Sequence, residues 1–164
     1  MSALRHVVIA LLFALPLFAD TLTYKSDSAS DFVLRREADR LTLRDRATRE
    51  LLASAPLMST RGVVIRGANG AQNDTLTIDL AQPFALDAGI DYDGGADGFD
   101  VLNLEGGFAT VQRVTQLTPH DGIIDIDGLV IRYTNLEPIN DTAPAATLTI
   151  SGTAGADTVT ITNG

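Results

Sequence analysis

One short loop carries the densest group of candidate metal ligands in this chain. Segment 91–100 reads Asp-Tyr-Asp-Gly-Gly-Ala-Asp-Gly-Phe-Asp, so four carboxylates, Asp91, Asp93, Asp97 and Asp100, fall within ten residues. Glycines let a backbone curl around a hard cation, and calcium takes about six to eight oxygen ligands. The spacing lacks the third close Asp and the bidentate Glu of an EF-hand. The loop is therefore a candidate calcium site, with a solvated acidic loop as the alternative.

Other residue types offer less chemistry. Asp125 and Asp127 alternate along a candidate strand and would share one face, as the paired carboxylates of polysaccharide-cleaving enzymes do. The chain has no Trp and only three Tyr to form a sugar-binding platform. The favoured interpretation is therefore that Asp125 and Asp127 lie on a solvent-exposed strand face without a catalytic role. His120 stands beside Asp121, but no serine lies in a nucleophile elbow. Beyond the N-terminal apolar segment His120 is the only histidine, too few for a typical zinc site.

A unit of turn and strand recurs three times, at 67–77, 94–102 and 152–160. Each copy has a glycine-bearing loop that allows positive φ, then an Asp that can bond its own backbone, then residues alternating as in a strand. Repetition of one supersecondary unit is typical of solenoid proteins. The pattern therefore predicts a stacked β architecture.

The intervals between the repeated acids indicate the size of one turn of the stack. The step along the chain from Asp74 to Asp100 is almost the same as the step from Asp100 to Asp125. An interval of this length suits one rung of a broad parallel β-helix. Asp127-Gly128 between two apolar runs is a hairpin signal, so an antiparallel hairpin is expected within 110–139.

Period-two alternation dominates the whole chain and predicts an all-β protein. The architecture expected is a parallel β-helix or solenoid over 62–164, continuing beyond the chain, preceded by an antiparallel meander over 20–61. A β-sandwich is the alternative, since it buries the same alternating residues. Strands are expected at 21–24, 32–36, 40–44, 50–53, 62–66, 74–80, 90–92, 100–104, 109–116, 123–127, 129–133, 146–150 and 158–162.

The first nineteen residues have the order of a secretory signal peptide. Arg5 and His6 precede the apolar run 7–15, Pro16 follows it, and the small residue Ala19 precedes the expected cleavage point. The run is too short to span a bilayer, and no second run of its kind follows, so no membrane span is expected after cleavage. The chain has no cysteine, which excludes disulfides and thiolate zinc sites.

Charge is unevenly distributed around a net value of −9. Residues 20–66 hold nine Lys or Arg against seven Asp or Glu, whereas residues 67–164 hold two Arg against fourteen acids. An acidic half repels a phosphate backbone and attracts cations, so nucleic acid is not an expected partner. The arginines from Arg35 to Arg49 are expected on the solvated face of strands.

The recurring unit resembles the nonapeptide of haemolysin-type calcium-binding proteins, G-G-x-G-x-D-x-U-x with U apolar. Segment 152–160, Gly-Thr-Ala-Gly-Ala-Asp-Thr-Val-Thr, matches it apart from Thr153. The resemblance implies calcium bound between consecutive stacked turns. The copies here are not adjacent in sequence, so no stacked pair of turns is expected. The order of meander, Gly-Asp units and closing unit also resembles modules of large, repeat-rich, adhesin-like bacterial surface proteins.

These features together predict a secreted or cell-surface structural or adhesive β-solenoid module that is not an enzyme. The alternatives are a fragment of a β-helix carbohydrate-active enzyme and a calcium-binding secreted domain, with calcium as the sole candidate cofactor. The expected partners are surface glycans, other surface proteins, or further copies of the chain joined through the solenoid ends.

Overall fold

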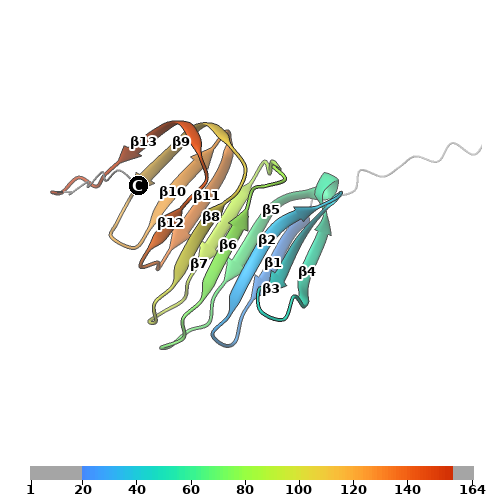
Figure 1. Cartoon of the computed structure of the whole chain (residues 1–164). Coiled ribbons are helices and arrows are strands. Elements are labelled where there is room, and N and C mark those ends of the chain that lie inside the picture. The colour runs from blue at the N-terminus through green and yellow to red at the C-terminus, as the bar shows by residue number, and fades with distance from the viewer. Residues whose placement is uncertain (1–19, 157–164) are drawn as a thin grey trace, which may run out of the picture.

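The protein, seen in a computed structural model that describes residues 20–156, consists of two mixed β-sheets that enclose one hydrophobic core (Figure 1). The described residues include one 3-10 turn, η1 (Leu57–Ser59), and no α-helix. The all-β prediction is confirmed. In order across the seven-stranded sheet the strands are β1 (Asp20–Lys25), β5 (Thr60–Arg66), β7 (Gly89–Asp93), β11 (Leu129–Thr134), β10 (Gly122–Ile126), β9 (Ala109–Gln116) and β13 (Ala145–Ser151). Across the six-stranded sheet they are β12 (Ile139–Asp141), β8 (Val101–Glu105), β6 (Thr75–Asp79), β2 (Asp31–Glu37), β3 (Arg40–Asp45) and β4 (Leu51–Pro56).

The chain passes repeatedly from one sheet to the other. It runs from β1 to β2, from β5 to β6, from β7 to β8 and from β11 to β12, and each of these steps crosses from the seven-stranded to the six-stranded sheet. Within each sheet these strands pair in parallel with their counterparts from the neighbouring crossing. Figure 1 shows the result, a row of strands that starts with β1–β4 and ends with β9–β13.

The parallel register places apolar side chains of neighbouring strands side by side in the core. In the seven-stranded sheet Tyr24, Ile65, Tyr92 and Tyr133 occupy one column, in which neighbouring strands place their residues side by side. Leu76 and Leu102 form the matching column of the six-stranded sheet, and both are fully buried. Alternation along each strand sends these side chains inward and the intervening polar ones outward. Burying each such side chain contributes about 1.5–3 kcal/mol.

Two antiparallel insertions interrupt the crossings. Strands β3 and β4 extend the six-stranded sheet beyond β2, and strands β9 and β10 extend the seven-stranded sheet beyond β11. The expected turn at Asp127-Gly128 joins β10 to β11, with both residues at positive φ. The expected rung from Asp100 to Asp125 is wrong, because the inserted hairpin delays the next crossing until Glu137.

Strand β1 differs from the expected arrangement of the N-terminal segment. The antiparallel meander comprises β2, β3 and β4, whereas β1 pairs in parallel with β5, across the expected boundary near residue 61. Alternation within 21–24 marks a strand without identifying its partner. The strands on either side of that boundary therefore share both sheets.

Twelve of the thirteen expected strands coincide with strands of the structure, and β12 was not expected. The thirteenth expected strand, 158–162, and the expected signal peptide, 1–19, lie outside the described residues. β12 was not predicted because its three residues, Ile139–Asp141, are too few to show alternation. Over the described range no helix is long and apolar enough to cross a membrane.

Truncating the core at one of these columns should weaken the whole fold. Leu102→Ala removes a fully buried side chain and is expected to lower the free energy of unfolding by about 2–5 kcal/mol. Met58→Ala is the matched control, because Met58 is 98% exposed, and should change it by less than about 0.5 kcal/mol. Urea unfolding of the three proteins measures both values, and equal losses would contradict the assigned core.

Candidate functional site

The four carboxylates of the acidic loop point in different directions. Asp91 and Asp93 lie in β7 on either side of the buried Tyr92, so both face outward. Asp91 is 3.3 Å from the guanidinium of Arg132. Asp93 lies 3.5 Å from the guanidinium of Arg66 on the neighbouring strand β5. Both side chains therefore take part in ion pairs across the outer face of the sheet.

Asp97 and Asp100 belong to the turn that follows β7. Asp97 is exposed and adopts positive φ, while Asp100 is almost completely buried at the start of β8. The structure therefore does not bring the four expected ligands together. Between residues 20 and 156 no group of three or more His, Asp or Glu side chains is arranged to hold a metal ion. Calcium binding by this loop stays a prediction.

The two Gly-Asp turns that precede β6 and β8 stack directly upon one another. Gly70 donates its N–H to the carbonyl of Ala96 at 2.7 Å, and Phe99 donates its N–H to the Asn73 side chain at 2.9 Å. The expectation that no two copies of the unit would stack is therefore wrong. The two copies are distant in sequence, but the chain passes once through each sheet, along β6 and then β7, and so returns to the position beside its starting turn.

A ladder of carboxylates runs through these stacked turns. Asp74 accepts the N–H of Ala68 at 2.7 Å. Asp100 accepts the N–H of Asp74 at 2.7 Å, and Glu137 accepts the N–H of Asp100 at 2.8 Å. Each acid thus satisfies a backbone donor of its own or the preceding turn, where an unpaired buried N–H would cost free energy. We call this set, Asp74, Asp100 and Glu137, the carboxylate ladder.

The glycines of the repeated unit make room for the ladder. A Cβ added at Gly67 would lie 2.0 Å from the carbonyl oxygen of Gly94 and 2.8 Å from the Asp74 carboxylate. A Cβ at Gly94 would lie 2.4 Å from the carbonyl oxygen of Asn135 and 2.8 Å from the Asp100 carboxylate. Glycine and Asp therefore recur together because the carboxylate occupies the space that any other residue's Cβ would need.

Burial perturbs the acids of the ladder. Burial, with smaller effects of the Asp74, Glu137 and Asp93 carboxylates, raises the pKa of Asp100 to about 6 against the opposing hydrogen bond from the Asp74 N–H. Burial likewise raises the pKa of Asp74, against the hydrogen bond from Ala68. Tyr92 faces the same corner, where burial and then the Asp100 and Asp74 charges raise the pKa of its phenol.

Asp125 and Asp127, the two carboxylates of the enzymatic alternative, make structural contacts. Asp127 accepts the N–H groups of Thr110 and Val111, and these hydrogen bonds lower its pKa. Asp125 accepts the N–H of Gly128 at 2.8 Å and lies 3.7 Å from Arg113. The two acids hold the hairpin of β10 and β11 and its neighbour β9.

His120 sits in the turn between β9 and β10. Its Nδ1 lies 3.2 Å from the carbonyl oxygen of Leu136 and 3.4 Å from the carboxylate of Glu137. The imidazole therefore connects this turn to the segment that carries the last acid of the ladder. Asp121, its neighbour in sequence, accepts the N–H of Asn135 at 3.0 Å.

The arginine cluster forms ion pairs on the outer face of the meander, as expected for a solvated strand face. Arg35 and Arg44, from adjacent strands, both contact the carboxylate of Glu37. Hydrogen bonds from Arg44 and then Arg35 lower the pKa of Glu37 to about 2. These half-exposed pairs contribute little stability each.

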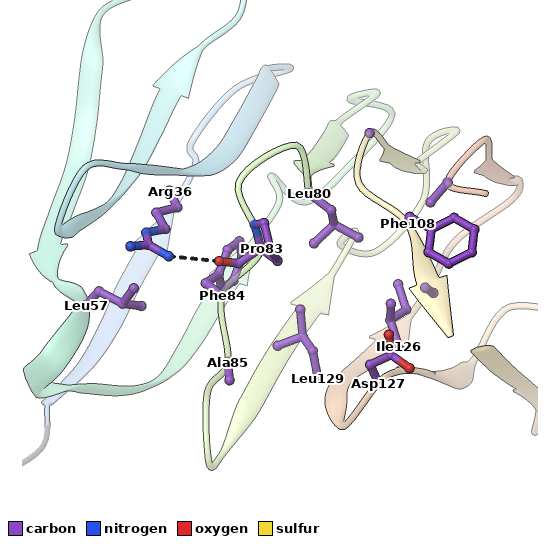
Figure 2. Close-up of a pocket in the computed structure, with 13 residues that line it drawn as sticks. Arg36, Leu57, Leu80, Pro83, Phe84, Ala85, Phe108, Ile126, Asp127 and Leu129 are labelled. Atoms are coloured by element: carbon purple, nitrogen blue, oxygen red, sulfur yellow. Dashed lines mark hydrogen bonds between the residues drawn. The ribbon is translucent and has the colours of Figure 1, made fainter. Parts of the chain in front are cut away.

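A groove that the sequence did not predict lies where the chain returns from the six-stranded to the seven-stranded sheet (Figure 2). It has a volume of about 410 Å³ and a mainly apolar lining that includes Leu57, Leu80, Phe84, Phe108 and Leu129. Phe108 is 70% exposed at its edge. The polar groups here are already occupied: Arg36 donates to the carbonyl of Pro83 at 3.1 Å, as the dashed line shows. The one feature of the sequence that could have indicated this groove is an aromatic residue, Phe108, placed directly after the turn glycines Gly106 and Gly107.

Comparison with protein-family models, curated proteins and solved structures finds no match for this chain.

Adding one methyl group at a corner glycine tests the role of the repeated unit. Gly67→Ala forces a Cβ to within 2.0 Å of a backbone oxygen, so two stacked turns must separate. We expect the free energy of unfolding to fall by about 2 kcal/mol or more. Gly155→Ala is the control, because among residues 20–156 the nearest atom to its Cβ is 3.5 Å away. Urea unfolding that shows equal effects for the two variants would contradict the packing described for the corner.

Asp100 should give the protein a distinctive pH dependence. Its raised pKa means that the folded protein holds the proton more tightly than the unfolded chain does. Its contribution to stability is therefore full below its ordinary pKa of about 4 and is lost as the pH rises through about 6. Relative to Asp100→Asn, the free energy of unfolding of the unaltered protein should fall between about pH 4 and pH 7, by at most about 3 kcal/mol.

Urea unfolding of both proteins at a series of pH values measures this difference. Subtraction removes the contributions of the acids that lie away from Asp100 and that both proteins share. A difference that stays constant over the range, or rises with pH, would show that Asp100 is not a buried acid in the folded state.

Proposed function

We propose that this protein is an exported module of a bacterial cell surface, built as a β-solenoid and acting as a structural or adhesive element. The observation that carries the proposal is the repeated crossing between two sheets with parallel, in-register pairing. The step along the chain from Ile65 to its neighbour Tyr92 in one sheet almost equals the step from Leu76 to its neighbour Leu102 in the other. A constant step of this kind is what rungs stacked along one axis require.

Stacked rungs have a mechanical consequence. The backbone hydrogen bonds of both sheets run along the axis of the stack, and the carboxylate ladder adds further bonds in the same direction. Pulling along that axis loads many hydrogen bonds together. A spacer that holds an adhesive surface away from a cell benefits from this stiffness.

The engagement of the chemistry-bearing side chains also favours a structural role. Asp74 and Asp100 bind backbone N–H groups, Asp127 caps a neighbouring strand, and Asp91 and Asp93 face arginines. Such pairing stabilises turns and sheet surfaces without creating a reactive group. Surface glycans or other surface proteins are the partners that we propose for a module of this kind. The groove beside Phe108 offers them an apolar contact.

Export is the property that tests the proposal most directly. The full chain, produced in a bacterium with a tag after Gly164, should be recovered outside the cytoplasm with a mass that lacks residues 1–19. A variant without residues 2–19 should fold equally well but remain in the cytoplasm. A product that keeps Met1 and stays inside would refute the proposal.

The exported protein also separates the proposed role from the enzymatic alternative. We expect it to bind polysaccharides at most, without releasing reducing ends from a panel of neutral and acidic glycans. Release that is lost in both Asp125→Asn and Asp127→Asn would establish the enzyme instead. Circular dichroism of the variants is needed beside the assay, because both acids also hold turns.

A further inference from the structure

The groove beside Phe108 lies at the carboxyl ends of four neighbouring strands. Strands β2, β6, β8 and β12 are adjacent in the six-stranded sheet and parallel to one another, so their carboxyl ends lie at one edge. The groove is lined there by one residue at or just after the end of each strand, in turn Arg36, Leu80, Gly106 and Ala143. Three strand spacings separate the first of these strands from the last, which gives this edge a length of about 14 Å. The shape of the groove therefore suits an extended ligand.

The lining of this groove is almost entirely apolar. Figure 2 draws 13 lining residues, and only two of them, Arg36 and Asp127, carry a charge. Phe108 contributes a largely exposed ring, whereas Phe84 and Leu129 also belong to the core cluster. The volume of about 410 Å³ falls within the range of about 300–1,000 Å³ that is typical of small-molecule sites. The groove therefore has the size and the lining to take up an apolar chain.

Arg36 places a positive charge at one end of the groove. It follows Phe32 and Leu34 at alternate positions of β2, and both of these are completely buried, so the Arg36 side chain leaves the strand on the core side. Its Nε donates to the carbonyl of Ala38 at 2.8 Å, and its Nη1 donates to the carbonyl of Pro83 at 3.1 Å. These carbonyls hold the guanidinium in place without neutralising its charge.

The charge of Arg36 has no counter-ion in the part of the chain that the structure describes. No carboxylate of residues 20–156 forms an ion pair with it, whereas the neighbouring Arg35 contacts Glu37. Asp127, the other charged lining residue, lies toward the opposite end of the groove and accepts two backbone N–H groups of β9 (Figure 2). An arginine has five N–H donors, and the two carbonyls engage two of them. Arg36 is therefore equipped to bind the anionic group of a ligand.

We propose that this groove binds a long-chain carboxylate, a fatty acid, with the carboxylate on Arg36 and the hydrocarbon chain extended past Leu129 toward Phe108. A guanidinium binds a carboxylate through two parallel hydrogen bonds, and each methylene that leaves water adds to the affinity. A neutral hydrocarbon would leave Arg36 without a counter-ion, and a cation would be repelled by it. The inference concerns the groove alone and does not depend on where the protein resides in the cell. A surface partner that contacts Phe108 would compete with the carboxylate.

The length of the hydrocarbon chain gives the first test. Isothermal titration calorimetry of the full chain with octanoate, decanoate and dodecanoate, each kept below its micelle concentration, measures the three affinities. The affinity should rise about fourfold for each methylene added, because each one removes further apolar surface from water. Equal affinities across the series, or no binding of dodecanoate at millimolar concentration, would overturn the proposal.

The variant Arg36→Gln tests recognition of the carboxylate. Its affinity for decanoate should fall by about tenfold or more, while its affinity for decanol, the neutral analogue, should not change. Arg40→Gln is the matched control, because Arg40 donates to Ser54 at 2.8 Å away from the groove, and both affinities should stay as they are. Equal losses in the two variants would show that net charge alone matters. Loss of decanol binding in Arg36→Gln would show that Arg36 keeps the groove in shape instead, and either result would overturn the assigned role of Arg36.

The variant Phe108→Ala tests the other end of the groove. Phe108 is 70% exposed, so its truncation should leave the fold intact, but dodecanoate should bind about tenfold more weakly because its chain loses an aromatic contact. Phe99→Ala is the matched control, because Phe99 is also exposed, at 53%, and lies outside the groove in the turn between β7 and β8. The same titrations measure both variants. Unchanged dodecanoate binding in Phe108→Ala would overturn the proposed path of the chain.

Discussion

The backbone of this protein turns sharply where it crosses from β5 to β6 and from β7 to β8, and those turns withdraw the peptide N–H groups of Ala68, Asp74 and Asp100 from water. The carboxylate ladder satisfies them. Asp74, Asp100 and Glu137 each accept an N–H from their own turn or the preceding one. Because the acceptor for one turn is often supplied by the next, the turns must stack in a fixed order. Strands β6 and β8 begin directly after Asp74 and Asp100, so this order also fixes their register in the six-stranded sheet.

This arrangement has an electrostatic cost. The acids of the ladder are neighbours in a poorly solvated corner, and burial raises the pKa of both Asp74 and Asp100. Hydrogen bonds from backbone N–H groups offset the cost for the ionised form, as they do at helix N-caps. In each ladder acid these hydrogen bonds engage one carboxylate oxygen in holding the turns together. The Gly-Asp unit can therefore recur in a chain as a device for stacking turns, whether or not it binds a metal.

The crossings also tolerate interruption. The meander of β3 and β4 and the hairpin of β9 and β10 both leave the repeated path, and the chain rejoins it in register. Tyr24 and Ile65 flank one insertion, and Tyr92 and Tyr133 flank the other, yet each pair forms the same parallel contact as the uninterrupted pair Ile65 and Tyr92. Insertions of this length cost little because they extend the edges of sheets and bring their own hydrogen bonds.

The sequence by itself determined the local structure. Alternation identified twelve strands, and Asp127-Gly128 identified the hairpin turn, because side-chain direction and positive φ are properties of neighbouring residues. The tertiary structure decided which strands pair, that β1 joins β5, and that the turns at Gly67 and Gly94 stack. It also placed Asp91 and Asp93 on the outer face of β7 and Asp100 in the interior. The close spacing of four acids in one loop could not reveal this difference. Contacts between residues that lie a full crossing apart depend on the path of the whole chain, and no local pattern records that path.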